Sequence, residues 1–298
     1  MYTIPLSPTP LTVEAVGTKA ASLGTLLSHS VRVPPGFIVS TAAHRRFLEA
    51  NTIEGSPGLM HDVNRDWSWP PDLVAEITHH LEQYPAHTRW AVRSSGVLED
   101  LADASFAGQY DTFLDVPKEA VLDRIRDCWS SLANAHAEFY AREHGLSLTD
   151  TTMAVIVQTL VNADVAGVSF SRHPVTGSDS VVINAAYGLG ESVVSGMVTP
   201  DSFEVDKLTQ SITSQLGFKE CQVRLSPGGG TEVIETSPDQ QNAYCLKAHH
   251  VLEIASVTHR LETLAGHPVD VEWALHSDTL YCLQMRPITR KTVGGMHS

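Results

Sequence analysis

Two alternating segments near the C-terminus constrain the fold of this chain more than any other part of it. Residues 270–273 and 280–287 alternate polar with apolar side chains, and a short polar turn joins them. Side chains two positions apart in a strand lie on the same face of it. In a hairpin the polar faces of the two strands can coincide. The pattern therefore predicts one wall with two carboxylates, an amide and a guanidinium, from Asp270, Glu272, Gln284 and Arg286.

This predicted wall has the chemistry of a magnesium–nucleotide site. Carboxylate and amide oxygens are hard ligands that suit Mg²⁺, so we predict Glu272 and Gln284 as metal ligands. The fixed fork of an arginine suits a phosphate, and Arg286 is expected to stabilise the charge on a transferring phosphoryl group. Asp270 is expected to hold Arg286 or Lys19 in place, or to bind the metal through water. A hairpin with one solvated polar face explains the same pattern equally well.

The composition disfavours several classes of partner. Lys and Arg number 20 against 34 Asp and Glu, and the formal net charge of −14 disfavours a nucleic acid or an anionic membrane. No apolar run approaches the ~20 residues of a membrane span, and the N-terminus lacks the basic and apolar regions of a signal peptide. The four cysteines are scattered and form no CxxC motif, so we expect a reduced, cytoplasmic globular protein.

Further segments carry residue types that suit phosphate groups. Lys19 opens a helical pattern, and the N-terminus of a helix favours phosphate. Arg93 ends an apolar strand, where a charge needs a partner. Small-residue loops at 94–96 and 105–109 let backbone amides approach phosphate oxygens closely, and the segment 188–191 reads Gly-Leu-Gly-Glu. Each signal is weak alone, because a solvated lysine, a buried ion pair and ordinary turns give the same residues.

Taken in their order along the chain, these segments resemble the N-terminal ATP-binding domain of the phosphoenolpyruvate synthase, pyruvate phosphate dikinase and rifampin phosphotransferase family. The resemblance runs from about Gly17 to Pro287. It implies a mixed α/β fold of the α+β class, ATP-grasp-like, with two lobes and a nucleotide cleft between them. The expected division is an N-terminal lobe at 1–157, a C-terminal lobe at 158–290 and a flexible tail at 291–298.

The resemblance also implies roles for individual residues. Lys19 and Arg93 match phosphate-contacting residues of the family and are expected to serve catalysis together with Arg286. The segment 99–109 is expected to cover the phosphates as a flexible loop, and Gln158 is expected to read the adenine edge. The full set of expected nucleotide-binding residues is Lys19, Arg93, Ser94, Ser95, Gly108, Gln109, Gln158, Glu191 and Arg286.

The resemblance implies an ATP-dependent phosphotransferase of the dikinase type that uses ATP and Mg²⁺. Relatives carry a phosphorylated histidine on a further domain, and this sequence ends shortly after Pro287, so we expect transfer to a histidine on a separate protein. His173 stands where relatives often have an acidic or amide residue, and we expect no phosphohistidine there. The alternatives are a self-contained kinase for a small-molecule acceptor and a non-catalytic nucleotide-binding partner. Release of AMP or of ADP separates the first two.

Periodicity predicts where helices and strands lie in the rest of the chain. Helical patterns cover residues 18–28, 117–145 and 238–266, and a loop covers residues 54–71. The second of these helices is expected to bury Val121, Ile125, Trp129, Leu132 and Phe139. Strands are expected at 152–160, 165–171 and 180–186. We assign these strands to the second lobe and place the junction near residues 158–160.

Overall fold

The computed structural model describes most of the chain and divides it into two compact units. The described residues are 1–51, 67–97, 112–132 and 152–288. One unit comprises Met1–Val161 together with Leu225–Thr231, and the other comprises Asn162–Arg224 together with Glu232–Ser298. The sequence placed the division between residues 157 and 158. The sequence did not indicate that the short segment Leu225–Thr231 belongs with the first unit.

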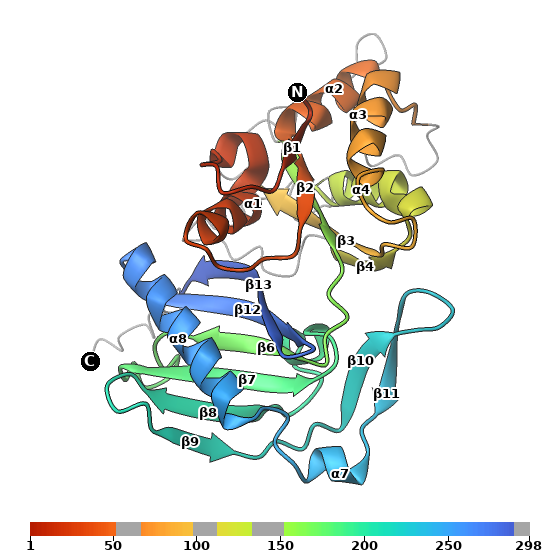
Figure 1. The fold of residues 1–298 in the computed structure, drawn as a ribbon. Coiled ribbons are helices and arrows are strands. Elements are labelled where there is room, and N and C mark those ends of the chain that lie inside the picture. The colour runs from red at the N-terminus through yellow and green to blue at the C-terminus, as the bar shows by residue number, and fades with distance from the viewer. Residues whose placement is uncertain (52–66, 98–111, 133–151, 289–298) are drawn as a thin grey trace, which may run out of the picture. The chain divides into compact units, whose positions relative to one another are not determined.

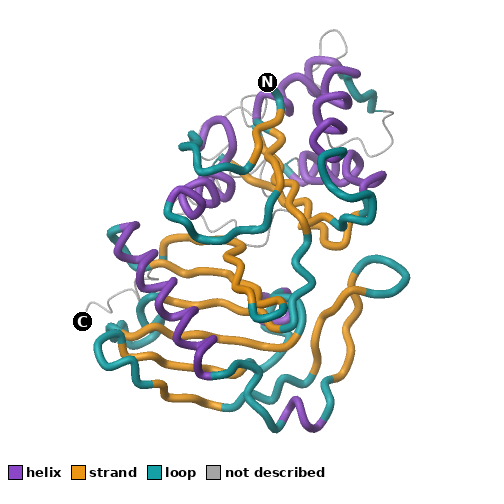
Figure 2. The backbone as a smooth tube through the Cα atoms, in the orientation of Figure 1, coloured by secondary structure: helices purple, strands orange, loops and turns teal. Residues whose placement is uncertain are grey.

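Within the described residues, the first unit is built on a five-stranded sheet in the order β1-β2-β5-β3-β4, with antiparallel neighbours throughout. Figure 1 draws its strands as arrows, and Figure 2 draws them in orange. The strands are β1 (Thr3–Pro5), β2 (Gly36–Val39), β3 (Trp90–Gly96), β4 (Thr112–Val116) and β5 (Met153–Thr159). The sequence assigned β5 to the second lobe, and that assignment was wrong. β5 is the central strand here, because it pairs with β2 on one side and β3 on the other. Its side chains Met153, Val155 and Val157 are buried in the core of this unit.

Helices cover both faces of this sheet. The helices α2 (Thr41–Ala50), α3 (Pro71–Leu81) and α4 (Val121–Ser131) pack on one face, with the short 3₁₀ helix η1 (Lys118–Ala120) before α4. The helix α1 (Val13–Ser28) contacts β3 and β5 through the other face, where Ala154 and Ile156 are buried. The expected inward residues Val121, Ile125, Trp129 and Leu132 are all buried. The expected continuation of α4 to residue 145, with Phe139, lies outside the described residues.

The second unit contains, in the part that the structure describes, a six-stranded antiparallel sheet in the order β13-β12-β6-β7-β8-β9. The strands are β6 (Val165–Phe170), β7 (Ser180–Tyr187), β8 (Asp201–Asp206), β9 (Ile212–Gln215), β12 (Val269–His276) and β13 (Thr279–Pro287). The long helix α8 (Ala248–Ala265) lies across one face of this sheet (Figure 1). Its buried side chains, including Val251 and Ile254, pack on Ile183 and Trp273. Gly266 ends α8 in the left-handed conformation, as expected of a C-terminal glycine.

A separate hairpin and a short helix complete this part of the chain. The hairpin pairs β10 (Cys221–Leu225) with β11 (Thr231–Glu235), and α7 (Pro238–Gln241) follows it. The sequence predicted one helix over residues 238–266, and the structure instead breaks it between α7 and α8. The reason is that the intervening segment is bound elsewhere, since the Cys245 N–H donates to Asp201 and Leu246 is buried. Among the described helices, none has the length and apolar character needed to cross a membrane.

A buried ion pair holds these connecting segments together. The Nζ of Lys219 lies 2.6 Å from Oδ1 of Asp201, and both side chains are 0% exposed. Asp201 also accepts the backbone N–H groups of Gly217 and Cys245, while Lys219 donates to the Gly217 carbonyl. Burying a charge is costly unless it is paired and hydrogen-bonded, and every one of these contacts offsets that cost.

Candidate functional site

The hairpin expected from the sequence is present, and it has the expected register. In the pairing of β12 with β13, Asp270 lies opposite Arg286 and Glu272 lies opposite Gln284. Directly opposite residues of an antiparallel pair have their side chains on the same face. Val271 and Trp273 alternate with the two carboxylates and are buried, with Trp273 in the core beneath α8. The four polar side chains therefore form one wall on the face of the sheet away from α8.

Within this wall, Asp270 and Arg286 form an ion pair. The Nε of Arg286 donates to Oδ2 of Asp270 over 2.8 Å. The Asp270 side chain is 8% exposed and that of Arg286 is 38% exposed. Of the three roles expected for Asp270, this geometry supports the first, in which the carboxylate orients the guanidinium. The contact uses Nε, one of five N–H donors that a guanidinium offers.

The start of β12 is fastened to the end of β6, one residue before Asp270. The Ser171 N–H donates to the Val269 carbonyl over 2.9 Å, and the Val269 N–H donates to Ser171 Oγ over 2.8 Å. On the face of the sheet toward α8, opposite to that of Asp270, Ser169 Oγ lies 2.7 Å from Thr258 Oγ1 of α8. These contacts fix the strand position from which Asp270 extends.

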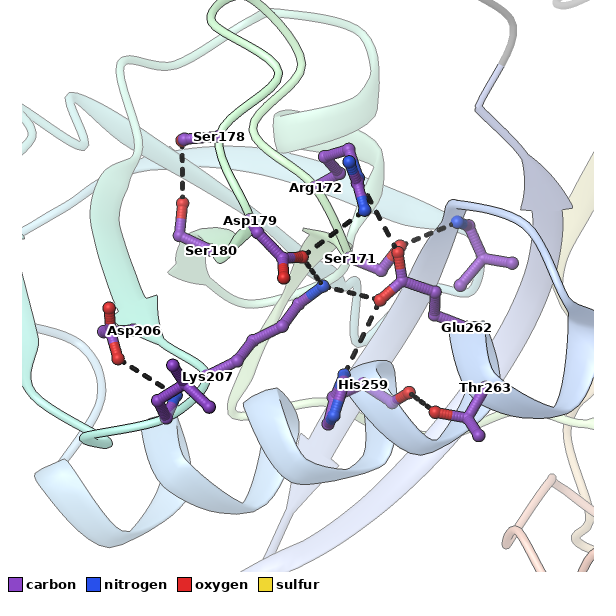
Figure 3. Close-up of polar contacts among 12 residues, drawn as sticks. Ser171, Arg172, Ser178, Asp179, Ser180, Asp206, Lys207, His259, Glu262 and Thr263 are labelled. Atoms are coloured by element: carbon purple, nitrogen blue, oxygen red, sulfur yellow. Dashed lines mark hydrogen bonds and ion pairs between the residues drawn. The ribbon is translucent and has the colours of Figure 1, made fainter.

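An ion-pair network continues this attachment from Ser171 to α8 (Figure 3). The Nζ of Lys207 lies 2.6 Å from both Asp179 Oδ1 and Glu262 Oε2, and the Lys207 side chain is only 6% exposed. Arg172 approaches Asp179 at 3.5 Å. The sequence did not indicate this network, because its members are far apart in the chain and each charge alone is typical of a solvated surface.

His173 begins a tight turn beside this network. Its Nδ1 accepts the backbone N–H groups of Val175 and Thr176, each over 3.2 Å. Asp and Asn side chains commonly accept such backbone donors in turns. The contact therefore gives His173 the role that an Asx residue commonly has in a turn.

Glu191 is the first residue of α6 (Glu191–Val194) and is exposed. The glycine before it, Gly190, packs on Ala166 of β6. A Cβ added at Gly190 would lie 3.6 Å from the Cβ of Ala166. Ala166 pairs with Ala274, which shares its face of β12 with Asp270 and Glu272. The helix α6 thus begins over the face of the sheet that carries the polar wall.

In the first unit, Lys19 lies in the first turn of a restarted helix, as expected. Gly17 has φ +73° and interrupts α1, and a Cβ there would lie 2.1 Å from the Ser95 carbonyl oxygen. Only glycine fits this position. Ser95 Oγ donates to the Val16 carbonyl over 2.8 Å and accepts the Ala20 N–H over 3.1 Å. The Ser95 hydroxyl thus caps the helical segment that carries Lys19, and this use accounts for its complete burial.

Arg93 shares a face of β3 with Ser95, since the two are two positions apart. Thr112 of β4 lies directly opposite Arg93 and is exposed. The Thr112 hydroxyl is thus a polar group next to Arg93 that the sequence did not single out. Ser94 points to the other face, opposite Val155 of the core. The structure therefore does not bring the Ser94 hydroxyl to the face that carries Arg93.

Gln158 lies in β5 and is 2% exposed. Its Nε2 donates to the Pro34 carbonyl over 2.9 Å, and Gly36 and Ala91 flank it in the sheet. The structure thus shows Gln158 holding the segment before β2, and its expected contact with adenine stays a prediction. Two other expected residues, Gly108 and Gln109, lie outside the described residues.

Comparison with known proteins decides the family. Residues 13–295 match the family described as pyruvate phosphate dikinase, AMP/ATP-binding domain. The chain belongs to this family. The match confirms the resemblance inferred from the motifs, and the structure confirms the α+β fold class that it implied.

Several curated relatives of this ATP-binding domain are phosphotransferases by name. An uncharacterized phosphotransferase, YvkC, from Bacillus subtilis is 36% identical over 97% of this chain and 35% of its own length. A probable phosphoenolpyruvate synthase from Methanothermobacter thermautotrophicus is 35% identical over 93% of this chain and 44% of its own. A rifampicin phosphotransferase from Bacillus subtilis is 33% identical over 93% of this chain and 34% of its own. The chain thus spans less than half the length of these relatives.

Among solved structures, D-alanyl-alanine synthetase A from Vibrio cholerae aligns with 94% of this chain and 60% of its own. The sequence identity is 8% and the TM-score is 0.36. D-alanine–D-alanine ligase from Helicobacter pylori aligns with 72% of this chain and 46% of its own, at 7% identity and a TM-score of 0.32.

For an ATP-binding domain of this family, the wall on β12 and β13 has a suitable donor set. Glu272 and Gln284 offer a carboxylate and an amide oxygen at facing positions, which suits a hard, oxygen-seeking cation such as Mg²⁺. Arg286 beside them offers a positive charge that Asp270 keeps oriented. Oxygen groups suited to a hard cation and a guanidinium suited to a phosphate therefore lie on adjacent rows of the same hairpin.

Proposed function

We propose that this ATP-binding domain binds Mg²⁺-ATP and passes a phosphoryl group to a histidine on a separate protein. The observation that carries the proposal is the register of β12 with β13, which groups Asp270, Glu272, Gln284 and Arg286 on one face. A merely solvated face would not require a nearly buried carboxylate oriented toward an arginine at 2.8 Å. Membership in a family of AMP/ATP-binding domains supports the same reading.

In this proposal, Glu272 and Gln284 hold the metal. A bound Mg²⁺ would neutralise charge on the phosphate oxygens of ATP. Arg286 binds the transferring phosphoryl group, and its charge acts mainly where negative charge develops in the transition state. Asp270 keeps the guanidinium in one orientation, so that little reorganisation accompanies the reaction. Each of these roles follows from the chemistry of the side chain and its place in the wall.

Lys19 and Arg93 supply further cations for the phosphates. Lys19 follows the break at Gly17, where the positive end of the restarted helix adds to its positive charge. Arg93 lies two residues before Ser95, which caps that helix. The two cations thus project from connected parts of the first unit, and we assign both to phosphate binding.

Labelled ATP identifies the acceptor directly. The protein is incubated with ATP labelled at the β- or the γ-phosphate, alone and with candidate histidine-bearing proteins encoded beside it. We expect AMP and an acid-labile label on the partner protein. A Glu272→Gln variant should abolish both products, and Glu253→Gln, an exposed residue of α8, serves as the control.

Three outcomes would contradict the proposal in different ways. Rapid formation of ADP with a small-molecule acceptor and no partner protein would replace it with direct kinase activity. Absence of ATP binding at millimolar nucleotide, measured by calorimetry, would remove the nucleotide site itself. Saturable ATP binding without any turnover across all partners would indicate a non-catalytic nucleotide-binding role.

A further inference from the structure

The turn between β12 and β13 meets the first turn of α8 in a cluster of two histidines and a carboxylate. One ligand atom from each of His249, His250 and Asp278 lies within 4.8 Å of the other two. His250 Nε2 lies 3.0 Å from Asp278 Oδ1, and the rings of His249 and His250 have centroids 3.9 Å apart. All three residues belong to the second unit.

Two of these three groups are held in place by the fold. The His250 side chain is 5% exposed, so its ring has little freedom. Ser277 and Asp278 both have left-handed backbone conformations, with φ of 49° and 59°, as in a tight two-residue hairpin turn. The Ser277 N–H also donates to Asp164 Oδ2 over 2.7 Å. Asp278 is therefore presented to His250 by a fixed turn, while His249 is exposed and can rotate.

We infer that His249, His250 and Asp278 form a binding site for a transition-metal ion of the Zn²⁺ class. Imidazole nitrogens select Zn²⁺, Co²⁺, Ni²⁺ or Cu²⁺ over Mg²⁺. Ligand atoms in a tetrahedral zinc site lie about 3.3 Å apart, given metal–ligand distances of about 2.0–2.1 Å. The 3.0 Å between His250 and Asp278 is close to that spacing. Rotation of the exposed His249 brings in the third ligand, and water completes the coordination.

Metal binding at this cluster replaces the hydrogen bond between His250 Nε2 and Asp278 Oδ1. The ring that binds the metal is the neutral tautomer with its proton on Nδ1, so the Nε2 lone pair and the carboxylate both become ligands. Because these ligands must be deprotonated, metal affinity falls as pH is lowered. The N-terminal end of a helix disfavours a cation, and the charge of Asp278 offsets this effect.

This metal site is separate from the proposed nucleotide site. Asp270 and His276 lie at opposite ends of β12, and six strand residues span about 20 Å. The inference does not depend on the proposed function, because it uses none of the residues assigned to nucleotide or Mg²⁺. Its physical effect is to join α8 to the β12–β13 turn, so the metal is expected to stabilise the second unit.

Cobalt absorption spectroscopy and zinc calorimetry on the protein without a histidine tag test the inference. We expect one Co²⁺ per chain with ligand-field bands that Zn²⁺ abolishes, and a raised unfolding temperature with Zn²⁺. His249→Gln and Asp278→Asn, both at exposed positions, should each weaken binding at least about 10-fold, since even loss of an outer-shell partner has that effect. His259→Gln, an exposed histidine of the same helix, is the matched control.

Three results would overturn the inference. Co²⁺ binding that is unchanged in both His249→Gln and Asp278→Asn would place the ion elsewhere. Loss of the Co²⁺ bands in Glu272→Gln, with the bands retained in the other two variants, would assign the ion to the wall on β12 and β13. Absence of any Co²⁺ or Zn²⁺ binding to the native chain would show that the cluster is only a hydrogen-bonded contact.

Discussion

Asp270 faces Arg286 across the β12–β13 pair, and its carboxylate accepts the Arg286 Nε–H over 2.8 Å. The acid is nearly buried, while the guanidinium remains partly exposed. A partner with this geometry removes rotational freedom from a long cationic side chain. The pair therefore offers a positive charge whose direction is set by the fold.

Arg286→Ala is expected to lower the rate of phosphoryl transfer by on the order of 10²-fold, with a smaller loss of ATP affinity. Asp270→Asn should lower the rate less, because the guanidinium remains but is held less firmly. Steady-state kinetics and calorimetric ATP binding separate the two effects. Arg224→Ala, an exposed arginine of β10, should leave both unchanged. An unaltered rate in Arg286→Ala would remove the hairpin from the active site.

Glu272→Gln is expected to uncouple ATP binding from Mg²⁺. The substitution keeps the shape of the side chain but removes the charged oxygen ligand that a hard cation prefers. Calorimetric titration with ATP, with and without Mg²⁺, should show strong dependence on the metal in the native protein and little in the variant. Glu253→Gln should behave as the native protein does. Full Mg²⁺ dependence in Glu272→Gln would assign the metal to other ligands.

Gly17→Ala is expected to destabilise the first unit far more than Gly196→Ala destabilises the second. Both glycines have φ near +70°, so both substitutions carry the left-handed penalty of about 1–2 kcal/mol. A Cβ at Gly17 also meets the Ser95 carbonyl at 2.1 Å, whereas nothing lies within 4 Å of one at Gly196. Hydrogen exchange of α1 and α6 measures each loss. Equal losses would contradict the contact with Ser95.

Asp201→Asn is expected to cost about 3–5 kcal/mol of stability in the second unit, because it leaves Lys219 buried without a charged partner. Loss of hydrogen-exchange protection in β8 and α8 measures the effect. Glu232→Gln breaks the exposed pair with Arg224 and should change little, since such pairs contribute little. A loss as small as that of the control would mean that water reaches Lys219.

His44 is expected to make the first unit sensitive to acid. Burial lowers the pKa of His44 from 6.5 to about 3, and the neutral ring accepts the Met153 N–H. Because the folded pKa lies below the unfolded one, stability is complete above about pH 6.5. It then falls by about 1.4 kcal/mol per pH unit between 6.5 and 3. His44→Asn should flatten this slope in denaturant unfolding at several pH values, whereas the exposed His259→Gln should preserve it.

The sequence predicted the parts of the site that follow from local periodicity. Strand alternation placed Asp270 and Glu272 on one face, and the short polar turn made pairing with Gln284 and Arg286 the natural register. The helix restart at Lys19 followed from the glycine before it. In each case the signal lies within about twenty residues, so no knowledge of distant neighbours was needed.

What the sequence did not indicate depends on contacts between distant segments. The network of Arg172, Asp179, Lys207 and Glu262 joins residues from two loops and a helix, and no local pattern marks them as partners. β5 reads as a buried strand in either unit, so its place beside β2 and β3 follows only from the assembled core. The hydrogen bond from the Gln158 amide to the Pro34 carbonyl also joins segments far apart in the chain, so no local pattern predicts it.

The cap that Ser95 provides has a consequence for the order in which the first unit folds. Most helices are capped by the residue just before them, but the N–H of Ala20 is satisfied by a hydroxyl 75 positions away in the chain. Closing so long a loop carries an entropic cost that local helix formation does not. The segment carrying Lys19 can therefore settle only after β3 has joined the sheet, and an isolated peptide of residues 13–28 would lack the conformation that presents this lysine.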